Sequence, residues 1–145
     1  MTLVLADPAA TVRLGEAVAA LLPEDATGWT LLLDGELGAG KSTLARALIR
    51  ALGHTGPVPS PTYTLVEPYE VAGQTVYHID LYRVGGEDEL RYLGWDELES
   101  GLRLVEWPGR APGLKAAADI EIRLEYAGAG RRASLIALSS RARDR

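Results

Sequence analysis

The chain has 145 residues, a formal net charge of −5 and 47% hydrophobic residues. This length suits one domain, and the composition is that of a packed protein and not of a disordered one. The absence of cysteine excludes disulfides and thiolate metal sites, and no apolar run approaches the roughly 20 residues that a membrane-spanning helix needs. We therefore expect a cytoplasmic protein with one domain, 1–145, and without the basic face that a strong direct grip on nucleic acid requires.

The first predicted element is a helix that begins at Asp7 and Pro8. Aspartate is a favoured N-cap residue, and proline suits the first helical position. Pro23 is expected to end this helix near residue 22. Its predicted apolar stripe consists of Val12, Leu14, Val18, Leu21 and Leu22.

The next segment carries the most informative motif of the chain. Residues 29–34 are typical of a buried strand, and residues 43–52 are typical of a helix that Gly53 ends. Between them, Gly35-Glu36-Leu37-Gly38-Ala39-Gly40-Lys41-Ser42 fits the phosphate-loop pattern G-x-x-x-x-G-K-[ST] at every constrained position. Glycines let backbone N–H groups curl round a phosphate, and the helix N-terminus adds partial positive charge there. The motif predicts a nucleoside triphosphate, with Lys41 on the β- and γ-phosphates and Ser42 on Mg²⁺.

The middle of the chain is predicted to form a loop, two strands and two short helices. Residues 54–61 carry three prolines and are expected to form a loop beside the site. Residues 63–71 are expected to be extended, and Ala72-Gly73 is a turn signal before a strand at 74–81. Pro68 favours an edge position or a break for the first of these strands. Helical segments are expected at 87–93 and 95–99.

The last third is predicted to be mostly strands. A buried strand at 101–107 is followed by a loop at 108–113. Strands at 118–126 and 132–138 are joined by Ala127-Gly128-Ala129-Gly130 as a hairpin, and residues 139–145 are expected to be a flexible basic tail. The fold class that follows is α/β. We expect a compact P-loop NTPase with a mixed sheet flanked by helices in three αβα layers and a C-terminal antiparallel hairpin.

Two carboxylates follow apolar strands and are candidates for hydrolytic chemistry. Asp80 ends its strand as a Walker B acid does, and Glu106 stands in the same position on a later strand. In open α/β sheets, ligands bind beyond the carboxyl ends of the strands, so both acids could face the phosphates. By pattern alone, Thr62 and Thr64 are ordinary strand threonines and His78 is a packed core residue, while Trp107 fits either the core or the rim of the site.

Four segments together resemble the TsaE (YjeE) family, small bacterial ATPases needed for the threonylcarbamoyladenosine modification of tRNA. The resemblance covers residues 7–138 and adds to the phosphate loop the segments Ser60-Pro61-Thr62-Tyr63-Thr64-Leu65-Val66, Tyr77-His78-Ile79-Asp80-Leu81-Tyr82-Arg83 and Val105-Glu106-Trp107-Pro108. It implies that the ATP phosphates are surrounded by Gly38, Ala39, Gly40, Lys41, Ser42 and Thr43.

The same resemblance implies further roles at the site. Glu106 joins Ser42 as a ligand of Mg²⁺, and Asp80, the Walker B-type acid that hydrolysis requires, is the third residue of the metal site. Lys41, Asp80 and Glu106 are thus the catalytic set. The remaining residues implied to lie near the nucleotide are Pro8 and Thr11 by the base, Thr62 and Thr64 on a switch-like loop, Trp107 beside the site, and Arg131 from the hairpin.

The resemblance also implies partners and a role for the ATP cycle. The family works with TsaB and TsaD, and TsaD transfers the threonylcarbamoyl group to adenosine 37 of tRNAs that read codons starting with A. A weak Mg²⁺-dependent ATPase, stimulated by these partners, would reset the complex for repeated turnover. The tRNA would be held by the partners, which suits the acidic charge of this chain.

Three other readings of a phosphate loop compete. A small-molecule kinase usually needs an arginine-rich lid, whereas the stretch 85–100 is acidic. A GTP switch would carry Asn/Thr-Lys-x-Asp, and the context of Lys115 does not fit it. A non-catalytic module that uses the nucleotide only to set its shape is the closest rival.

Overall fold

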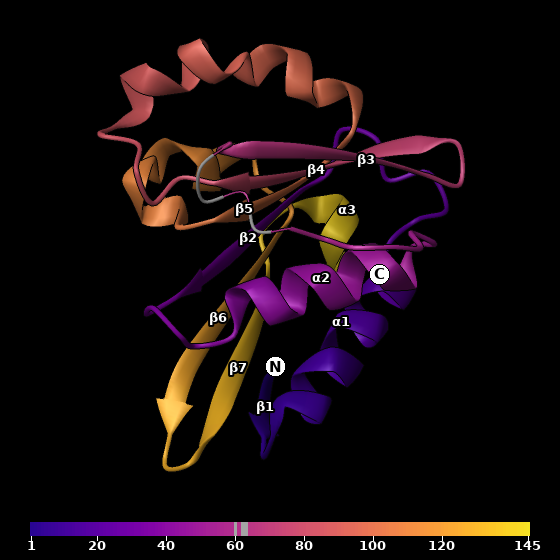
Figure 1. Cartoon of the computed structure of the whole chain (residues 1–145), viewed down its shortest axis with the longest axis vertical. Coiled ribbons are helices and arrows are strands. Elements are labelled where there is room, and N and C mark those ends of the chain that lie inside the picture. Colours follow the sequence, from indigo (N-terminus) through magenta and orange to yellow (C-terminus); the bar gives the residue numbers. More distant parts are fainter. Residues whose placement is uncertain (60, 62–63) are drawn as a thin grey trace.

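The structure is a computed structural model that describes residues 1–59, 61 and 64–145. Its centre is a seven-stranded mixed sheet with the strand order β1-β7-β6-β2-β5-β4-β3 (Figure 1). The mixed α/β architecture is the predicted one. The strands are β1 (Thr2–Leu5), β2 (Thr30–Gly35), β3 (Val66–Val71), β4 (Gln74–Asp80), β5 (Leu102–Glu106), β6 (Ile120–Ala127) and β7 (Gly130–Ala137).

The centre of the sheet is parallel, and this sets where its carboxyl ends lie. β2 pairs in parallel with both β5 and β6, and β4 pairs in parallel with β5. Leu33 is the register partner of Glu106, and Glu106 is the partner of Asp80. The ends of β2, β5 and β4 therefore meet at one edge of the sheet, directly before the loop that follows Gly35.

One face of the sheet is covered by α1 (Pro8–Leu21) and α2 (Lys41–Ala51), which run beside each other (Figure 1). The predicted cap is confirmed, since Oδ1 of Asp7 accepts a hydrogen bond from the N–H of Ala10 at 2.9 Å. Of the predicted stripe, Val12 and Leu21 are exposed, because the buried face passes through Gly15 instead. A Cβ on Gly15 would lie 2.7 Å from that of Ala47, so glycine allows the two helices to approach closely.

The other face is covered by short 3-10 segments, the first two of which coincide with the helical segments expected at 87–93 and 95–99. These are η1 (Glu87–Leu93), η2 (Trp95–Ser100), η3 (Pro108–Arg110) and η4 (Pro112–Ala117), and the last two replace most of the loop expected at 108–113. They pack Leu90, Leu98 and Ala111 against Leu32 and Val105 of the sheet. Glycines and prolines at their ends keep these segments short. In the described residues, no helix is long and apolar enough to cross a membrane.

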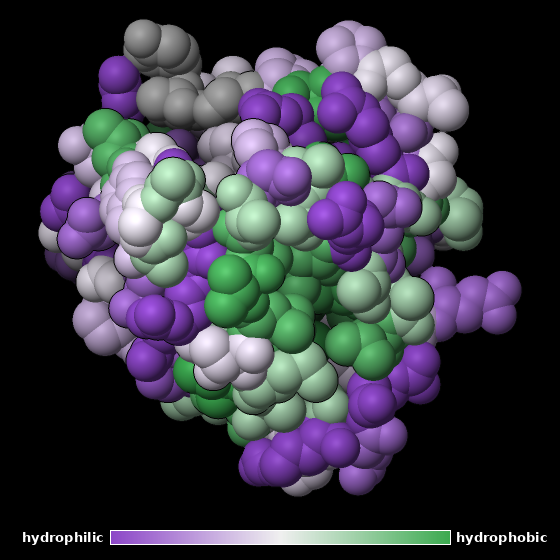
Figure 2. All heavy atoms as spheres, turned by 90° about the horizontal axis from the view of Figure 1, so that it is seen from below, coloured by the Kyte–Doolittle hydropathy of each residue, from purple (hydrophilic) through white to green (hydrophobic). Residues whose placement is uncertain are grey.

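One edge strand of the sheet was predicted, and the other was not. β3 is an edge strand, as Pro68 predicts, because proline cannot donate to a neighbouring strand. β1 forms the opposite edge, and it was not predicted because four residues are too few for a clear pattern. Met1 and Val4 of this end are about four-fifths exposed. Figure 2 views the molecule from this end and shows apolar residues gathered at its centre with hydrophilic ones around them.

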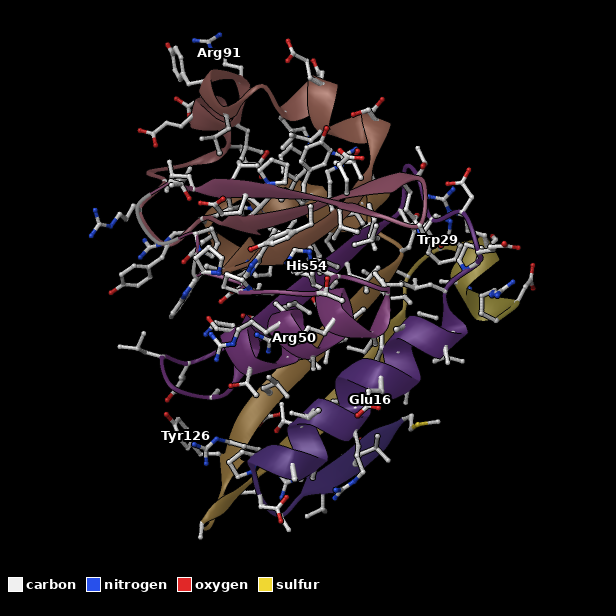
Figure 3. All side chains as sticks on the ribbon, turned by 45° about the vertical axis from the view of Figure 1, so that its right-hand side comes forward. Glu16, Trp29, Arg50, His54, Arg91 and Tyr126 are labelled. Carbon is white, nitrogen blue, oxygen red and sulfur yellow. The ribbon has the colours of Figure 1, made fainter. Side chains whose placement is uncertain are left out.

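The segment expected to be a flexible tail is instead held against the body of the protein. Helix α3 (Ser140–Arg143) follows β7, and Arg141 donates to Oδ1 of Asp119 at 2.8 Å and to Oδ2 at 2.9 Å. The guanidinium also lies 4.6 Å from the centre of the Trp29 ring, beside α3 in Figure 3. The sequence shows only a run of arginines here, whereas the fold supplies a buried carboxylate that binds one of them.

We expect Asp119 to make stability depend on acid pH. Burial by itself raises the pKa of this carboxyl, but hydrogen bonds from Arg141, Ser139 and Thr30 outweigh burial and hold the pKa below its usual value. A lowered folded-state pKa stabilises the protein above the unfolded value of about 3.9, and this contribution is lost as pH falls through the folded value. Asp119→Asn should lower the free energy of unfolding by about 1–3 kcal/mol at pH 7.

Urea unfolding across a pH series would measure this difference. The gap between wild type and Asp119→Asn should narrow below about pH 4. Asp144→Asn changes an exposed carboxylate of the same C-terminal segment and serves as the control. A gap that stays constant across the acid range would contradict the assignment.

Candidate functional site

The loop between β2 and α2 has the backbone of an anion cradle. Gly38 and Gly40 adopt φ values of +80° and +108°, which side chains with a Cβ rarely allow. Gly40 is the N-cap of α2 and makes no side-chain cap hydrogen bond, so the first N–H groups of the helix stay available to a ligand. A Cβ on Gly35 would lie 2.7 Å from the carbonyl oxygen of Leu124. The glycines of the motif are therefore required by conformation and by close approach to β6.

Lys41 stands at the centre of this loop and is buried. Its Nζ donates to the carbonyl oxygens of Gly35 at 2.5 Å and Glu36 at 3.0 Å, and it lies 4.1 Å from the centre of the Trp107 ring. Burial lowers the pKa of the Lys41 ammonium, and the carboxylates of Glu106, Asp34 and Asp80 act against that decrease. An arriving phosphate would further favour the charged lysine, because opposite charges stabilise each other strongly in a buried site.

Ser42 and Glu106 come together from α2 and β5. The hydroxyl of Ser42 donates to Oε1 of Glu106 at 3.2 Å, and its distance to Oε2 is 3.4 Å. Two oxygen ligands at right angles on Mg²⁺ stand about 3 Å apart, so a hydroxyl and a carboxylate at this separation fit that ion. The described part of the chain has no group of three or more His, Cys, Asp or Glu side chains suited to a metal. Phosphate and water would have to complete the octahedron, as is usual for Mg²⁺.

Asp80 lies beside Glu106 at the end of β4. Burial raises the pKa of its carboxyl, as does the negative charge of Glu106, while a hydrogen bond from the backbone N–H of Tyr82 at 2.9 Å acts in the opposite direction. A pocket of about 220 Å³ contains both acids together with Lys41 and Ser42. The remaining residues of this pocket are Leu37, Gly38, Gly40, Thr43, Tyr82 and Trp107.

Trp107 reaches this pocket because its backbone is left-handed. Its φ of +58° is unusual for a large side chain and turns the chain sharply after Glu106. The ring then covers Lys41 and meets the ring of Tyr82 at a centroid distance of 4.8 Å. The sequence left the core and the rim open for this tryptophan, and its side chain contributes to both, since it lines the pocket and packs against the buried cluster that contains Leu32 and Val105.

A second pocket of about 150 Å³ lies on the other side of the phosphate loop. The first turn of α1 contributes Asp7, Pro8 and Thr11, and the hairpin contributes Gly130 and Arg131. Thr43 and Ala39 belong to the loop side of this pocket, and Leu5 and Ala129 complete it. The structure therefore brings Pro8, Thr11 and Arg131 together beside the loop, although Arg131 is more than 100 residues from the other two in sequence.

The β6–β7 hairpin braces the phosphate loop from outside. The Tyr126 hydroxyl donates to the carbonyl of Leu37 at 2.6 Å, and Arg131 Nη2 donates to that of Gly38 at 3.2 Å. The two side chains stack, with the guanidinium carbon 4.2 Å from the Tyr126 ring centre. Figure 3 shows Tyr126 extending from this hairpin toward the loop. Both hydrogen bonds orient loop carbonyls outward, away from the position of a bound anion.

One predicted site residue is not gathered at the site, and another cannot be placed. Thr62 lies outside the described residues, and Thr64 is exposed, where its hydroxyl donates to Glu67 at 2.8 Å. Conversely, sequence reasoning assigned His78 to the core and did not single out Tyr126. His78 is buried, but its Nε2 lies 2.5 Å from Oε2 of Glu106. The alternation of a strand places residues 78 and 80 on one face, and that spacing was the signal that could have found it.

Comparisons with known proteins agree on one family. A family model described as "Threonylcarbamoyl adenosine biosynthesis protein TsaE" matches residues 5–134. A protein of Haemophilus influenzae named "tRNA threonylcarbamoyladenosine biosynthesis protein TsaE" is 38% identical over 141 residues, which are 94% of this chain and 89% of that protein. A Synechocystis protein of the same name is 41% identical over 120 residues, covering 79% and 74% of the two chains.

A solved structure is similar over almost the whole chain. The crystal structure of Bacillus subtilis YdiB superposes with a TM-score of 0.76 at 26% sequence identity, covering 99% of this chain and 89% of the other. This similarity agrees with the mixed sheet and its flanking helices.

We expect the hairpin brace to order the phosphate loop. Tyr126→Phe removes the hydrogen bond to Leu37 and should accelerate amide hydrogen exchange in residues 36–40, while global stability changes by no more than about 1 kcal/mol. Tyr92→Phe alters another exposed tyrosine far from the loop and is the matched control. Equal exchange in both variants would show that the loop needs no support from the hairpin.

Proposed function

Because the chain belongs to the TsaE family of threonylcarbamoyl adenosine biosynthesis proteins, we propose that it is the ATP-binding and ATP-hydrolysing component of threonylcarbamoyladenosine synthesis on tRNA. The observation that carries the catalytic part of this proposal is the meeting of Lys41, Ser42, Asp80 and Glu106 in one pocket at the carboxyl edge of parallel strands. A phosphate loop that only bound an anion would not need two carboxylates in the same pocket.

The phosphates of ATP would lie over the loop and the N-terminus of α2. The backbone N–H groups of Gly38 to Thr43 would bind the β-phosphate, with the partial positive charge of the helix end behind them. Lys41 would exchange its two loop carbonyls for phosphate oxygens, which are stronger acceptors because they are charged.

Ser42 and Glu106 would hold Mg²⁺, with Asp80 on the same side. When bound, this ion neutralises charge on the β- and γ-phosphate oxygens. Asp80 lines the same pocket, and its carboxylate would accept a hydrogen bond from the attacking water and orient it toward the γ-phosphate. Glu106 would thus hold the ion, and Asp80 would position the attacking water beside it.

The second pocket would receive the nucleoside. Pro8 and Thr11 line its α1 side and suit contact with a base, whereas Arg131 lies where ribose or α-phosphate oxygens would emerge from the loop. Trp107, at the other pocket, would cover the γ-phosphate end and limit access of bulk water. Thr62 and Thr64 remain candidates for a loop that senses the γ-phosphate.

We further propose that TsaB and TsaD are the partners and that the site works weakly without them. The chain carries a net charge of −5, so partners would hold the polyanionic tRNA. The ATP cycle would then reset the assembly after each modification, and the threonylcarbamoyl transfer itself would take place on TsaD.

The direct test is tRNA modification by the purified chain with TsaB, TsaD, ATP and Mg²⁺. We expect several modified adenosines per complex, and Lys41→Ala should limit the reaction to at most one turnover because it removes the phosphate-binding cation. Lys115→Ala removes the only other lysine and should behave as wild type. ATP hydrolysis that ignores the partners, or transfer of the γ-phosphate to a small acceptor, would instead favour a stand-alone ATPase or a kinase.

Substitution of either acid should impair ATP hydrolysis and leave metal-free ATP binding intact. Asp80→Asn and Glu106→Gln keep the side-chain shapes, so ATP affinity without metal, measured by calorimetry, should be preserved. Partner-stimulated hydrolysis should fall by at least about 100-fold, the usual effect of removing a positioned acid or base. Asp96→Asn, at an exposed acidic residue, is the control. If hydrolysis continues at the wild-type rate in both site variants, neither carboxylate takes part and the non-catalytic alternative gains.

A further inference from the structure

His78 is a buried polar residue that the proposed chemistry does not yet use. It lies in the middle of β4 and is fully buried. In the register of β4 and β5 it is the partner of Leu104, two residues before the pair formed by Asp80 and Glu106. Strand alternation therefore places His78 on the same face of the sheet as both acids, beneath α2.

Among the described residues, the hydrogen-bond partner of the imidazole is Glu106. Nε2 lies 2.5 Å from Oε2, and the two side chains are 1% and 4% exposed. A carboxylate that binds Mg²⁺ can only accept a hydrogen bond, so in that role of Glu106 the hydrogen lies on Nε2 of His78. Within the described residues, Nδ1 has no hydrogen-bond partner. An apolar side chain would avoid that unpartnered nitrogen, so packing alone does not explain a histidine here.

The contact completes a chain of three side chains from three elements. His78 binds Oε2 of Glu106, and the Ser42 hydroxyl approaches Oε1 at 3.2 Å. The carboxylate of a glutamate is attached by three rotatable bonds and would otherwise rotate, and a donor behind one oxygen fixes the plane of both. The oxygen that faces Ser42 is thereby held toward the pocket.

We propose that His78 is the positioning residue of Glu106: its Nε2–H fixes the carboxylate in the orientation that receives Mg²⁺ beside Ser42. This inference rests on the proposed function, because it assigns a role within the same nucleotide site. Groups behind a metal ligand orient it in this way in many metal sites, and their loss typically weakens metal binding by about 10–100-fold.

The test compares ATP binding in MgCl₂ and in EDTA for three variants of the full chain. His78→Leu removes the donor with little change of volume, His78→Gln retains an N–H at a similar reach, and Val76→Ala creates a small defect elsewhere in β4. Calorimetry measures affinity, and thermal unfolding without ligand reports stability. Should His78→Leu fail to fold, His78→Asn replaces it, since its shorter amide cannot reach Glu106.

The ratio of ATP affinity in MgCl₂ to ATP affinity in EDTA should be smaller in His78→Leu than in wild type by at least about 10-fold. The affinity in EDTA should be unchanged. His78→Gln should recover most of the metal-dependent gain, and Val76→Ala should lower the unfolding temperature without changing that gain. A Leu variant that responds to Mg²⁺ like wild type, that weakens equally in both buffers, or that Gln does not rescue would overturn the inference. If wild type itself binds no ATP or ignores Mg²⁺, the proposed function fails first, and the two failures are thus distinguished.

Discussion

The parallel pairing of β2, β5 and β4 is the constraint on which the site depends. In parallel strands the carboxyl ends lie at one edge, and the register here aligns Leu33 with Glu106 and Glu106 with Asp80. The chain must leave β2 at that same edge, and it does so through the loop that leads into α2. Backbone pairing thus brings into one pocket a phosphate cradle, the N-terminus of a helix and two acids, whatever rotamers the side chains adopt.

The loop is held by contacts on both of its sides. Inside, Lys41 donates to two of its carbonyls, and outside, Tyr126 and Arg131 donate to the next two. Carbonyls bound in this way are turned from the cradle, which leaves its N–H groups free for an anion. The close approach of Gly35 to β6 joins the loop to the same hairpin. The hairpin is therefore part of the nucleotide site as well as an edge region of the sheet.

Three carboxylates lie close enough to the buried lysine of the site to act on its charge. Asp34, Asp80 and Glu106 all act on Lys41, and burial opposes its charge. Carboxylates gathered this closely favour the arrival of a cation, and the lysine favours the arrival of phosphate. A nucleotide bound together with Mg²⁺ places its phosphate at the lysine and the ion at the carboxylates. A nucleotide without the ion would bring phosphate close to carboxylates, and the ion without a nucleotide would lie close to the lysine. This arrangement of charges is a physical reason for the proposed joint requirement for ATP and Mg²⁺.

The sequence by itself determined the phosphate loop, the α/β class, the presence of α1 and α2, and the strand ends that carry Asp80 and Glu106. These follow from local rules of capping, glycine spacing and apolar runs. The start of α1 was predicted correctly, whereas α2 begins at Lys41 and not at residue 43. Only the tertiary structure decided that His78 reaches Glu106, that Trp107 turns back over Lys41, and that Asp119 holds the arginine-rich C-terminus. Each of these depends on strand register or on a left-handed backbone, which join residues distant in sequence. Local patterns do not show which distant residues pair, so the binding of the C-terminal segment was missed for the same reason, whereas β1 was missed because it is too short for a clear pattern.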